Sequence, residues 1–254
     1  MNIKGETIVI TGGASGLGAA TALHLAQMGA NIAILDRNID MAKKIAAKVH
    51  GAAFACDVSN SEQVENIFKE VVEKFKTVRG CVNCAGIAPG KRLVGRDEPH
   101  PVADFKKTIE INLLGTFYLM RMAASHMSTL TPVGKDQARG VIINTASIAA
   151  FEGQIGQVAY SASKGGVASM TLPAARELAN FGIRVMTIAP GIFATPMLLG
   201  MSQQVQDSLG AQVPYPKRLG QGHEYALLVQ QIFENDMLNG SVIRLDGAIR
   251  LAPK

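Results

Sequence analysis

Tyr160 and Lys164 are two side chains whose spacing can support acid/base chemistry. They fall on a predicted helix, where residues four apart share one face. A free tyrosine has a pKa of about 10 and is a poor base at neutral pH, but a neighbouring ammonium favours the phenolate. Ser147 ends a strand-like run 13 residues before Tyr160 and can hydrogen-bond a substrate oxygen. We predict that the three form an acid/base site, although a Tyr-Lys pair alone also suits a plain helix face.

A glycine-rich turn lies near the start of the chain, from Thr11 to Gly18. It joins an apolar, β-branched run to a helical pattern, the context in which glycines let a backbone approach a pyrophosphate. The helix N-terminus then meets the negative charge. We therefore predict a dinucleotide site with contacts from Gly12, Ser15, Gly16, Leu17 and Gly18.

Asp36 ends the second strand-like run, 18 residues after Gly18. A carboxylate there accepts hydrogen bonds from both ribose hydroxyls of NAD and repels the 2′-phosphate of NADP. The adjacent Arg37 complicates this prediction because it can pair with that phosphate; otherwise it lies over the adenine or faces solvent. The sequence favours NAD.

Seven apolar runs alternate with helical patterns and must position these residues. Near-continuous apolar runs indicate strands buried on both faces, so we predict an α/β fold, a single Rossmann-like domain over 1–254 with a doubly wound parallel sheet. The cofactor-binding part is about 1–150 and the catalytic and substrate part about 140–254. The predicted strands are 6–11, 31–36, 52–57, 80–85, 140–147, 183–190 and 241–247. The predicted helices are 17–28, 39–49, 59–75 (opened by a Ser59–Glu62 capping box), 102–130, 158–180 and 222–235.

The TGxxxGxG turn and the Ser147, Tyr160 and Lys164 set resemble the short-chain dehydrogenase/reductase family, and the resemblance extends from Thr11 to Asp246. It implies that Asn112, in Asn-Leu-Leu-Gly, joins a water-linked proton relay to Lys164. It also implies that Thr195 grips the nicotinamide carboxamide. The remaining cofactor contacts that it implies are Asp57, Val58, Asn83, Ala85, Gly86, Tyr160, Lys164, Pro190 and Gly191. The segment after the fourth strand departs from the family's Asn-Asn-Ala-Gly, because Cys84 replaces the second Asn.

Three longer segments, 139–166, 183–197 and 239–251, resemble the type-two 3-hydroxyacyl-CoA dehydrogenase branch. That resemblance implies NAD-linked oxidation of a 3-hydroxyacyl-CoA to the 3-oxoacyl form, or the reverse. A hydroxysteroid or other alcohol dehydrogenase is an alternative. A 3-oxoacyl-acyl-carrier-protein reductase commonly uses NADPH and carries a basic residue where this chain has Ser15. A further alternative is a non-catalytic NAD-binding scaffold or redox sensor. Such a protein is expected to have lost the Ser-Tyr-Lys set, which this chain keeps.

The substrate contacts are the least specified part. A long Leu- and Met-rich connection, 192–217, suits a lid over an acyl chain, or else oligomer contacts or core. Gln154 and Gln157 can bond a substrate carbonyl or cap the catalytic helix. Basic residues that can meet CoA phosphates are Lys91, Arg92, Arg96, Lys217 and Arg218.

The amino-acid composition limits the classes of protein to which the chain can belong. The 254 residues are 48% hydrophobic and 18% charged, which excludes intrinsic disorder. The net charge of +5 is scattered, so we expect no nucleic-acid partner. No uncharged stretch suits a membrane span, and no leader is evident, so we expect a cytoplasmic protein, or a mitochondrial matrix protein in a eukaryote.

Cys81 and Cys84 are a possible redox or metal pair, but residues three apart on a strand point to opposite faces. We predict two buried thiols and no metal site, since the five histidines show no ligand spacing. The low charge also suits subunit contacts. We expect a homotetramer, as the family resemblance implies, with 158–173 at an interface.

Overall fold

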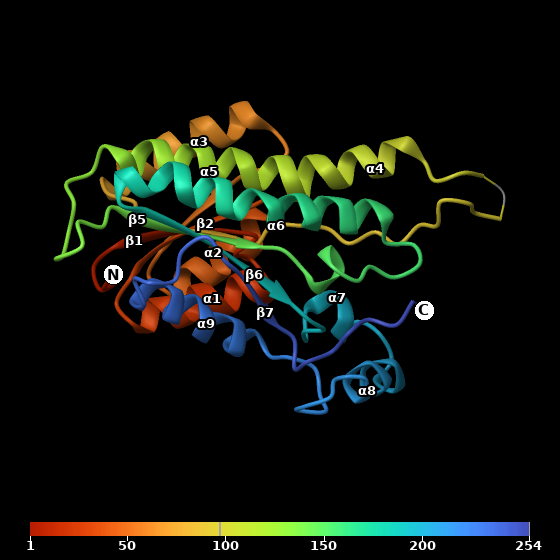
Figure 1. Cartoon of the computed structure of the whole chain (residues 1–254). Helices are drawn as coiled ribbons and strands as arrows, with labels where there is room; N and C mark the ends of the chain where they lie inside the picture. The colour runs from red at the N-terminus through yellow and green to blue at the C-terminus, as the bar shows by residue number, and fades with distance from the viewer. Residues whose placement is uncertain (97, 254) are drawn as a thin grey trace.

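Buried apolar runs explain the sheet at the centre of the molecule. All residues of two strands, Thr7–Thr11 and Gly140–Thr145, are buried, as expected where helices cover both faces. The computed structural model describes residues 1–96 and 98–253. Its seven strands pair in parallel in the order β3-β2-β1-β4-β5-β6-β7 (Figure 1), which confirms the doubly wound fold. They are β1 (Thr7–Thr11), β2 (Asn31–Asp36), β3 (Ala52–Ala55), β4 (Gly80–Asn83), β5 (Gly140–Thr145), β6 (Ile183–Pro190) and β7 (Val242–Leu245).

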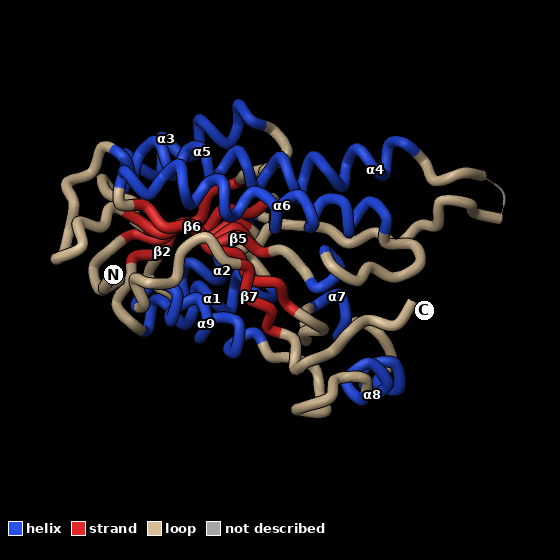
Figure 2. Tube along the Cα trace, viewed as in Figure 1, coloured by secondary structure: helices blue, strands red, loops and turns tan. Residues whose placement is uncertain are grey.

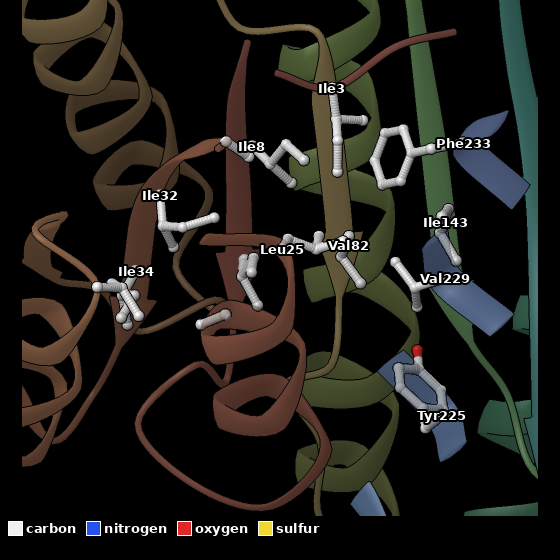
Figure 3. Packing of buried hydrophobic residues seen from close by; sticks show 14 of the residues in the cluster. Ile3, Ile8, Leu25, Ile32, Ile34, Val82, Ile143, Tyr225, Val229 and Phe233 are labelled. Carbon is white, nitrogen blue, oxygen red and sulfur yellow. The ribbon is translucent and has the colours of Figure 1, made fainter. Parts of the chain in front are cut away.

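Helices cover the two faces of this sheet (Figures 1 and 2). Helices α1, α2 and α9 pack on one face and α3, α5 and α6 on the other, each face with its own apolar cluster. Figure 3 shows side chains from β1, β2, β4 and β5 meeting those of α1 and α9 in the first cluster. The helices are α1 (Gly16–Gln27), α2 (Ile39–Lys48), α3 (Ser61–Phe75), α4 (Val102–Ile109), α5 (Gly115–Ser128), α6 (Val158–Leu178), α7 (Pro196–Leu199), α8 (Gln203–Ala211) and α9 (Gly222–Glu234).

Three local predictions differ from the structure. The predicted helix 102–130 is α4 and α5 joined by a π-helical segment, Glu110–Leu114. The 192–217 connection contains α7 and α8 rather than an irregular loop. The Ser59 cap was wrong: the Asn60 side chain accepts the Gln63 N–H at 3.0 Å. The Ser59 hydroxyl instead donates to the Asp57 carboxylate at 2.6 Å, which turns the Ser59 side chain toward the end of β3.

The two neighbouring cysteines point to opposite faces, as predicted. Cys81 is buried in the cluster under α3 and α5, and Cys84 packs against the cluster under α1 and α9. Both are free thiols. Within residues 1–96 and 98–253 there is no group of three His, Cys, Asp or Glu side chains placed to hold a metal ion. No helix in these ranges is long and apolar enough to cross a membrane.

Candidate active site

The glycine-rich turn packs too closely against its neighbours to carry side chains. Gly12 has a φ of +64°, and a Cβ there would lie 2.8 Å from the Ala85 backbone nitrogen. A Cβ on Gly18 would lie 2.4 Å from the Gly12 carbonyl oxygen. Glycine therefore lets the turn meet the end of β4 and lets α1 start directly on the turn.

The N-terminus of α1 is open to a negatively charged ligand. Ser15 is the N-cap residue, but its side chain makes no capping hydrogen bond, and the first turn contains no acidic residue. The free N–H groups of the first turn carry partial positive charge. Thr195 and Pro196 lie across this turn, since a Cβ on Gly16 would be 3.5 Å from Pro196 Cδ. The donors and the tight backbone fit the pyrophosphate of a dinucleotide.

Asp36 is fixed at the end of β2. Its two carboxylate oxygens accept the Ala14 N–H at 3.1 Å and the Asn38 N–H at 2.9 Å. A carboxylate has about four acceptor positions, so each oxygen can take a further donor. The exposed Arg37 lies near Asp57, whose pKa is held below its ordinary value by hydrogen bonds from Ser59 against the effect of burial, with a contribution from Arg37. The Asp36 carboxylate thus keeps acceptor positions that fit the hydroxyls of a ribose.

Other predicted cofactor residues hold the strand ends together. Asn83 donates to the Asn144 side chain at 2.9 Å, and both amides are buried, which ties β4 to β5. The Ala85 N–H donates to Thr11 Oγ1 at 3.2 Å. The Gly191 N–H, after Pro190, donates to the Leu245 carbonyl at 2.9 Å. Val58 is buried beneath Gly115, where a Cβ would clash with it at 2.8 Å.

Ser147, Tyr160 and Lys164 come together at the carboxyl ends of β5 and β4. Ser147 Oγ accepts the Ala149 N–H at 3.1 Å, and the Ser147 hydroxyl lies close enough to Tyr160 to interact with its phenol. Lys164 is 5% exposed, its Nζ lies 5.9 Å from the centre of the Tyr160 ring, and it donates to the Thr145 carbonyl at 2.7 Å. Thr145 is a site residue that was not predicted, and its only signal in the sequence is its place two residues before Ser147.

Burial dominates the electrostatics of this set. It raises the pKa of Tyr160, and the neighbouring Ser147 hydroxyl partly offsets the rise. It lowers the pKa of Lys164 to about 8. The spacing of Tyr160 and Lys164 predicted that the Tyr160 phenolate is favoured. In the protein without cofactor, burial instead opposes the phenolate, and the Ser147 hydroxyl is the group that favours it.

Asn112 lies in the π-helical segment between α4 and α5 and is completely buried. Its amide donates to the Ile87 carbonyl at 2.9 Å and to Ser163 Oγ at 3.0 Å, while its oxygen accepts the Ile87 N–H at 2.8 Å. A Cβ on Gly86 would lie 3.2 Å from Asn112 Oδ1 and 3.5 Å from Lys164 Nζ. The Asn112 side chain thus joins the loop after β4 to α6 beside Lys164. Both N–H donors of the Asn112 side chain are used, so this side chain can take part in a proton relay only as a hydrogen-bond acceptor.

The loop between Ser147 and Tyr160 is held by the C-terminal segment. Arg244 on β7 pairs with Glu152 through both terminal nitrogens and with Asp246 at 2.7 Å. Gln154 donates to the Ala252 carbonyl at 3.0 Å, and Gln157 accepts the Gln154 N–H at 3.0 Å. The Gln157 side chain therefore does not cap α6, and a substrate contact by either glutamine stays a prediction.

The predicted basic residues lie on two loops. The Lys91 N–H donates to the Gly156 carbonyl at 2.8 Å, which places the loop after β4 beside the start of α6 (Figure 1). Two of the cations have acidic partners: Lys91 pairs with Asp104 at 2.6 Å and Arg218 with Glu224 at 2.8 Å. Arg92, Arg96 and Lys217 are exposed.

Residues 6–206 match the family described as short chain dehydrogenase, and the chain belongs to that family of oxidoreductases. Within it, the chain is similar to 3-hydroxyacyl-CoA dehydrogenase type-2 of Bos taurus, at 51% identity over 99% of this chain and 98% of that protein. The corresponding protein of Homo sapiens is 50% identical over 99% of this chain and 98% of its own length. A crystal structure of 3-hydroxyacyl-CoA dehydrogenase type-2 from Mycobacterium avium superposes with a TM-score of 0.91 at 37% identity, covering 98% of this chain and 97% of the other. The family and branch that the motifs predicted are confirmed.

Proposed function

We propose that this enzyme interconverts a 3-hydroxyacyl-CoA and the 3-oxoacyl-CoA, with NAD as its cofactor. The observation that carries the proposal is that Ser147, Tyr160 and Lys164 meet at the carboxyl ends of β4 and β5, the same edge of the sheet at which the uncapped N-terminus of α1 follows β1. The substrate class comes from the names of the relatives that are similar over nearly the whole chain.

The residues fit a dinucleotide. Glycines in the turn and the free N–H groups of α1 suit the pyrophosphate, and the Asp36 carboxylate suits ribose hydroxyls rather than a 2′-phosphate. When bound, NAD supplies the nicotinamide ring that accepts a hydride from the substrate carbon. Thr195 and Pro190-Gly191 border the same edge and are proposed to hold that ring.

The protein's part in the reaction is proton transfer and orientation. Ser147 Oγ is proposed to donate its proton to the substrate oxygen, which would hold that oxygen beside Tyr160 while the Ala149 N–H keeps Ser147 Oγ in place. Tyr160 Oη takes the hydroxyl proton as the alcohol becomes a ketone, and returns it in the reverse direction. Lys164 supplies positive charge next to the phenol, and Asn112 fixes the loop and helix on either side of Lys164.

The substrate is proposed to extend from this edge under 192–217. Leu199 and Met201 are exposed there, as an apolar cover for an acyl chain would be before substrate binds. Gln154 and Gln157 are proposed to border the reacting carbonyl. Arg92, Arg96 and Lys217 have exposed charges that suit CoA phosphates. The cofactor part, about 1–150, and the substrate part, about 140–254, then share one domain.

The test is an NADH-absorbance assay of the purified protein with 3-hydroxyacyl-CoA esters, hydroxysteroids and simple secondary alcohols, each with NAD and NADP. We expect the CoA esters and NAD to give the highest kcat/KM. Tyr160→Phe should lower kcat by about 10²–10⁴-fold, the usual contribution of a general acid/base. Tyr118→Phe, which changes a half-buried tyrosine on α5, should leave kcat unchanged. Full activity of Tyr160→Phe would refute the mechanism, and a preference for steroids or NADP would refute the substrate or cofactor.

Two further parts of the proposal concern the whole protein. Other copies of the chain are its proposed protein partners, in a homotetramer. The proposed location is the cytoplasm, or the mitochondrial matrix in a eukaryote, where its three free thiols stay reduced. Fractionation of the source cells tests the location.

A further inference from the structure

Two buried hydroxyls and one partly buried thiol form a ring next to the Lys164 ammonium. Tyr225 Oη on α9 and Thr145 Oγ1 at the end of β5 are 2.7 Å apart. Thr145 Oγ1 donates to Cys84 Sγ at 3.6 Å, and Cys84 Sγ donates to Tyr225 Oη at 3.7 Å. With Tyr225 donating to Thr145, each group donates once and accepts once. The ring therefore joins α9 to the ends of β5 and β4.

The Tyr225 hydroxyl has no role in packing. The side chain is 0% exposed and belongs to the apolar cluster between the sheet and α1 and α9. Figure 3 shows it in line with Val229 and Phe233, which come after it along α9, and its hydroxyl oxygen is the polar atom among these side chains. Phenylalanine would fill the same space without placing a hydroxyl in an apolar region, which costs free energy unless the hydroxyl is bonded. The hydroxyl must be explained by what it holds.

The Tyr225 hydroxyl holds Thr145, the residue whose carbonyl accepts a hydrogen bond from Lys164. The Thr145 side chain bonds Tyr225 on the α9 side, and the Thr145 carbonyl accepts the Lys164 ammonium at 2.7 Å. An ammonium has three donors, so one bond to Thr145 leaves two for a ligand or for the relay. Because the ammonium is buried, its position and its charge depend strongly on this acceptor.

The other groups around Lys164 do not replace Thr145. Tyr160, one turn earlier on α6, presents its ring at 5.9 Å. Cys84, after β4, is near enough to interact with the charge on Lys164. Asn112 lies close to Lys164 across Gly86, but both of its N–H donors go to Ile87 and Ser163. Among the described residues, the Thr145 carbonyl is the one hydrogen-bond acceptor of Lys164 Nζ.

We propose that Tyr225 is a positioning residue for Lys164, acting through the Tyr225–Thr145–Cys84 ring to hold the Thr145 carbonyl against the ammonium. This inference rests on the catalytic role proposed above for Lys164. It also gives a physical reason for the Cys84 that departs from the family's Asn-Asn-Ala-Gly: the thiol closes the ring.

Tyr225→Phe removes one oxygen and tests the ring. We expect kcat/KM to fall about threefold to tenfold, the effect of one lost hydrogen bond. The titration of Lys164, followed by NMR of lysine side-chain nitrogens in the protein without cofactor, should shift to lower pH by about half a unit to one unit, because the charged form loses its fixed acceptor. The Lys164 signal is assigned by its absence in Lys164→Met. Cys84→Ala opens the same ring from β4 and should give smaller shifts in the same direction.

Thr187→Val is the matched control, because it breaks another buried hydroxyl pair, Thr171–Thr187 at 2.6 Å, between β6 and the helix that carries Lys164. It should lower stability but leave kcat/KM and the Lys164 titration unchanged. If Tyr225→Phe and Cys84→Ala behave like Thr187→Val, the inference is wrong. An inactive wild-type protein, or a fully active Tyr160→Phe, would instead refute the proposed function; the Lys164 titration would still decide whether the ring positions the ammonium.

Discussion

At the scale of single residues, the site places a charge where folding disfavours it. Lys164 is buried, and burial lowers its pKa from 10.5 to about 8. The native protein at neutral pH therefore carries a buried ammonium with a backbone carbonyl as its hydrogen-bond acceptor. Such a group reduces stability, and it suits a reaction that needs positive charge next to a phenol.

Replacing this lysine should make the protein without cofactor more stable. We expect Lys164→Met to raise the free energy of unfolding at neutral pH by about 1–3 kcal/mol, the cost of the buried charge less the bond to Thr145. Activity should be lost. Urea denaturation of both proteins measures the difference, with Lys48→Met, at the exposed end of α2, as the control.

The difference in the free energy of unfolding between Lys164→Met and the wild type should become smaller as the pH rises. Between about pH 8 and 10.5 the unfolded wild-type chain keeps the Lys164 proton and the native protein loses it. The unfolded state then binds more protons, so the stability of the wild type rises with pH relative to Lys164→Met. The advantage of the variant should therefore shrink from about pH 7.5 to about pH 9.5. An advantage that stays constant would mean that the native protein keeps the Lys164 proton up to about pH 9.5, so that burial does not lower the pKa of Lys164.

Residues with strong local patterns could be predicted from the sequence, and those that act through tertiary contacts could not. The turn glycines, Asp36 and the Ser147-Tyr160-Lys164 set have spacings tied to strand ends and helix turns. Tyr225 is 80 residues from Thr145 in sequence, and no local pattern links them. A partner across that separation is fixed only when the sheet order is known.

At the scale of elements, strands and helices were predicted correctly where the hydrophobic pattern of the sequence agrees with the burial of the residues in the fold. All seven strands form in the predicted places, and the central strands β1, β4 and β5 are apolar runs whose residues are all buried. The π-helical segment at Glu110–Leu114 has no such signature. It depends on Asn112 bonding the loop after β4 and α6, both distant in sequence. π-Helical segments often lie at functional sites, which agrees with the place of Asn112 beside Lys164.

The start of α3 shows why boundaries are harder. Ser59-x-x-Glu62 and Asn60 both fit a helix start, and the choice depends on a competing bond. Asp57 accepts the Ser59 hydroxyl and N–H at 2.6 and 3.0 Å, which orients the Ser59 side chain toward Asp57, and the Asn60 side chain accepts the Gln63 N–H. A sequence pattern does not show which acceptor is nearer.

Substitutions at these two positions should separate the roles. Asn60→Ala removes the acceptor for the Gln63 N–H and should lower the free energy of unfolding by about 1 kcal/mol, the usual effect of losing an N-cap. Its kcat should be unchanged. Ser59→Ala should leave α3 capped but raise the pKa of Asp57, because the Ser59 hydroxyl is the main cause of its lowering. Urea denaturation and an NMR titration of the Asp57 carboxyl measure these effects; a larger loss of stability in Ser59→Ala would restore Ser59 as the cap.

At the scale of the whole molecule, the outer surface contains apolar side chains that the fold does not use. Leu172 and Val158 on α6 are 44% and 41% exposed, and Phe117 on α5 is 42% exposed. Both helices cover the same face of the sheet (Figure 1). Exposed apolar groups on neighbouring helices mark interaction surfaces, and the segment 158–173 was predicted from its sparse charge to contact another subunit.

A second copy of the chain is the partner that this face is expected to bind. Leu172→Glu places a charge among those side chains and should weaken self-association by about 2 kcal/mol, which is roughly thirtyfold in the dissociation constant. Phe117→Glu should act in the same direction, because it changes the neighbouring helix. Met41→Glu is the control: Met41 is 40% exposed on α2, which packs on the opposite face of the sheet. Sedimentation velocity over a range of concentrations measures the masses. Wild-type protein that sediments as a monomer, or a Leu172→Glu variant with the wild-type mass at every concentration, would mean that this face binds no second copy.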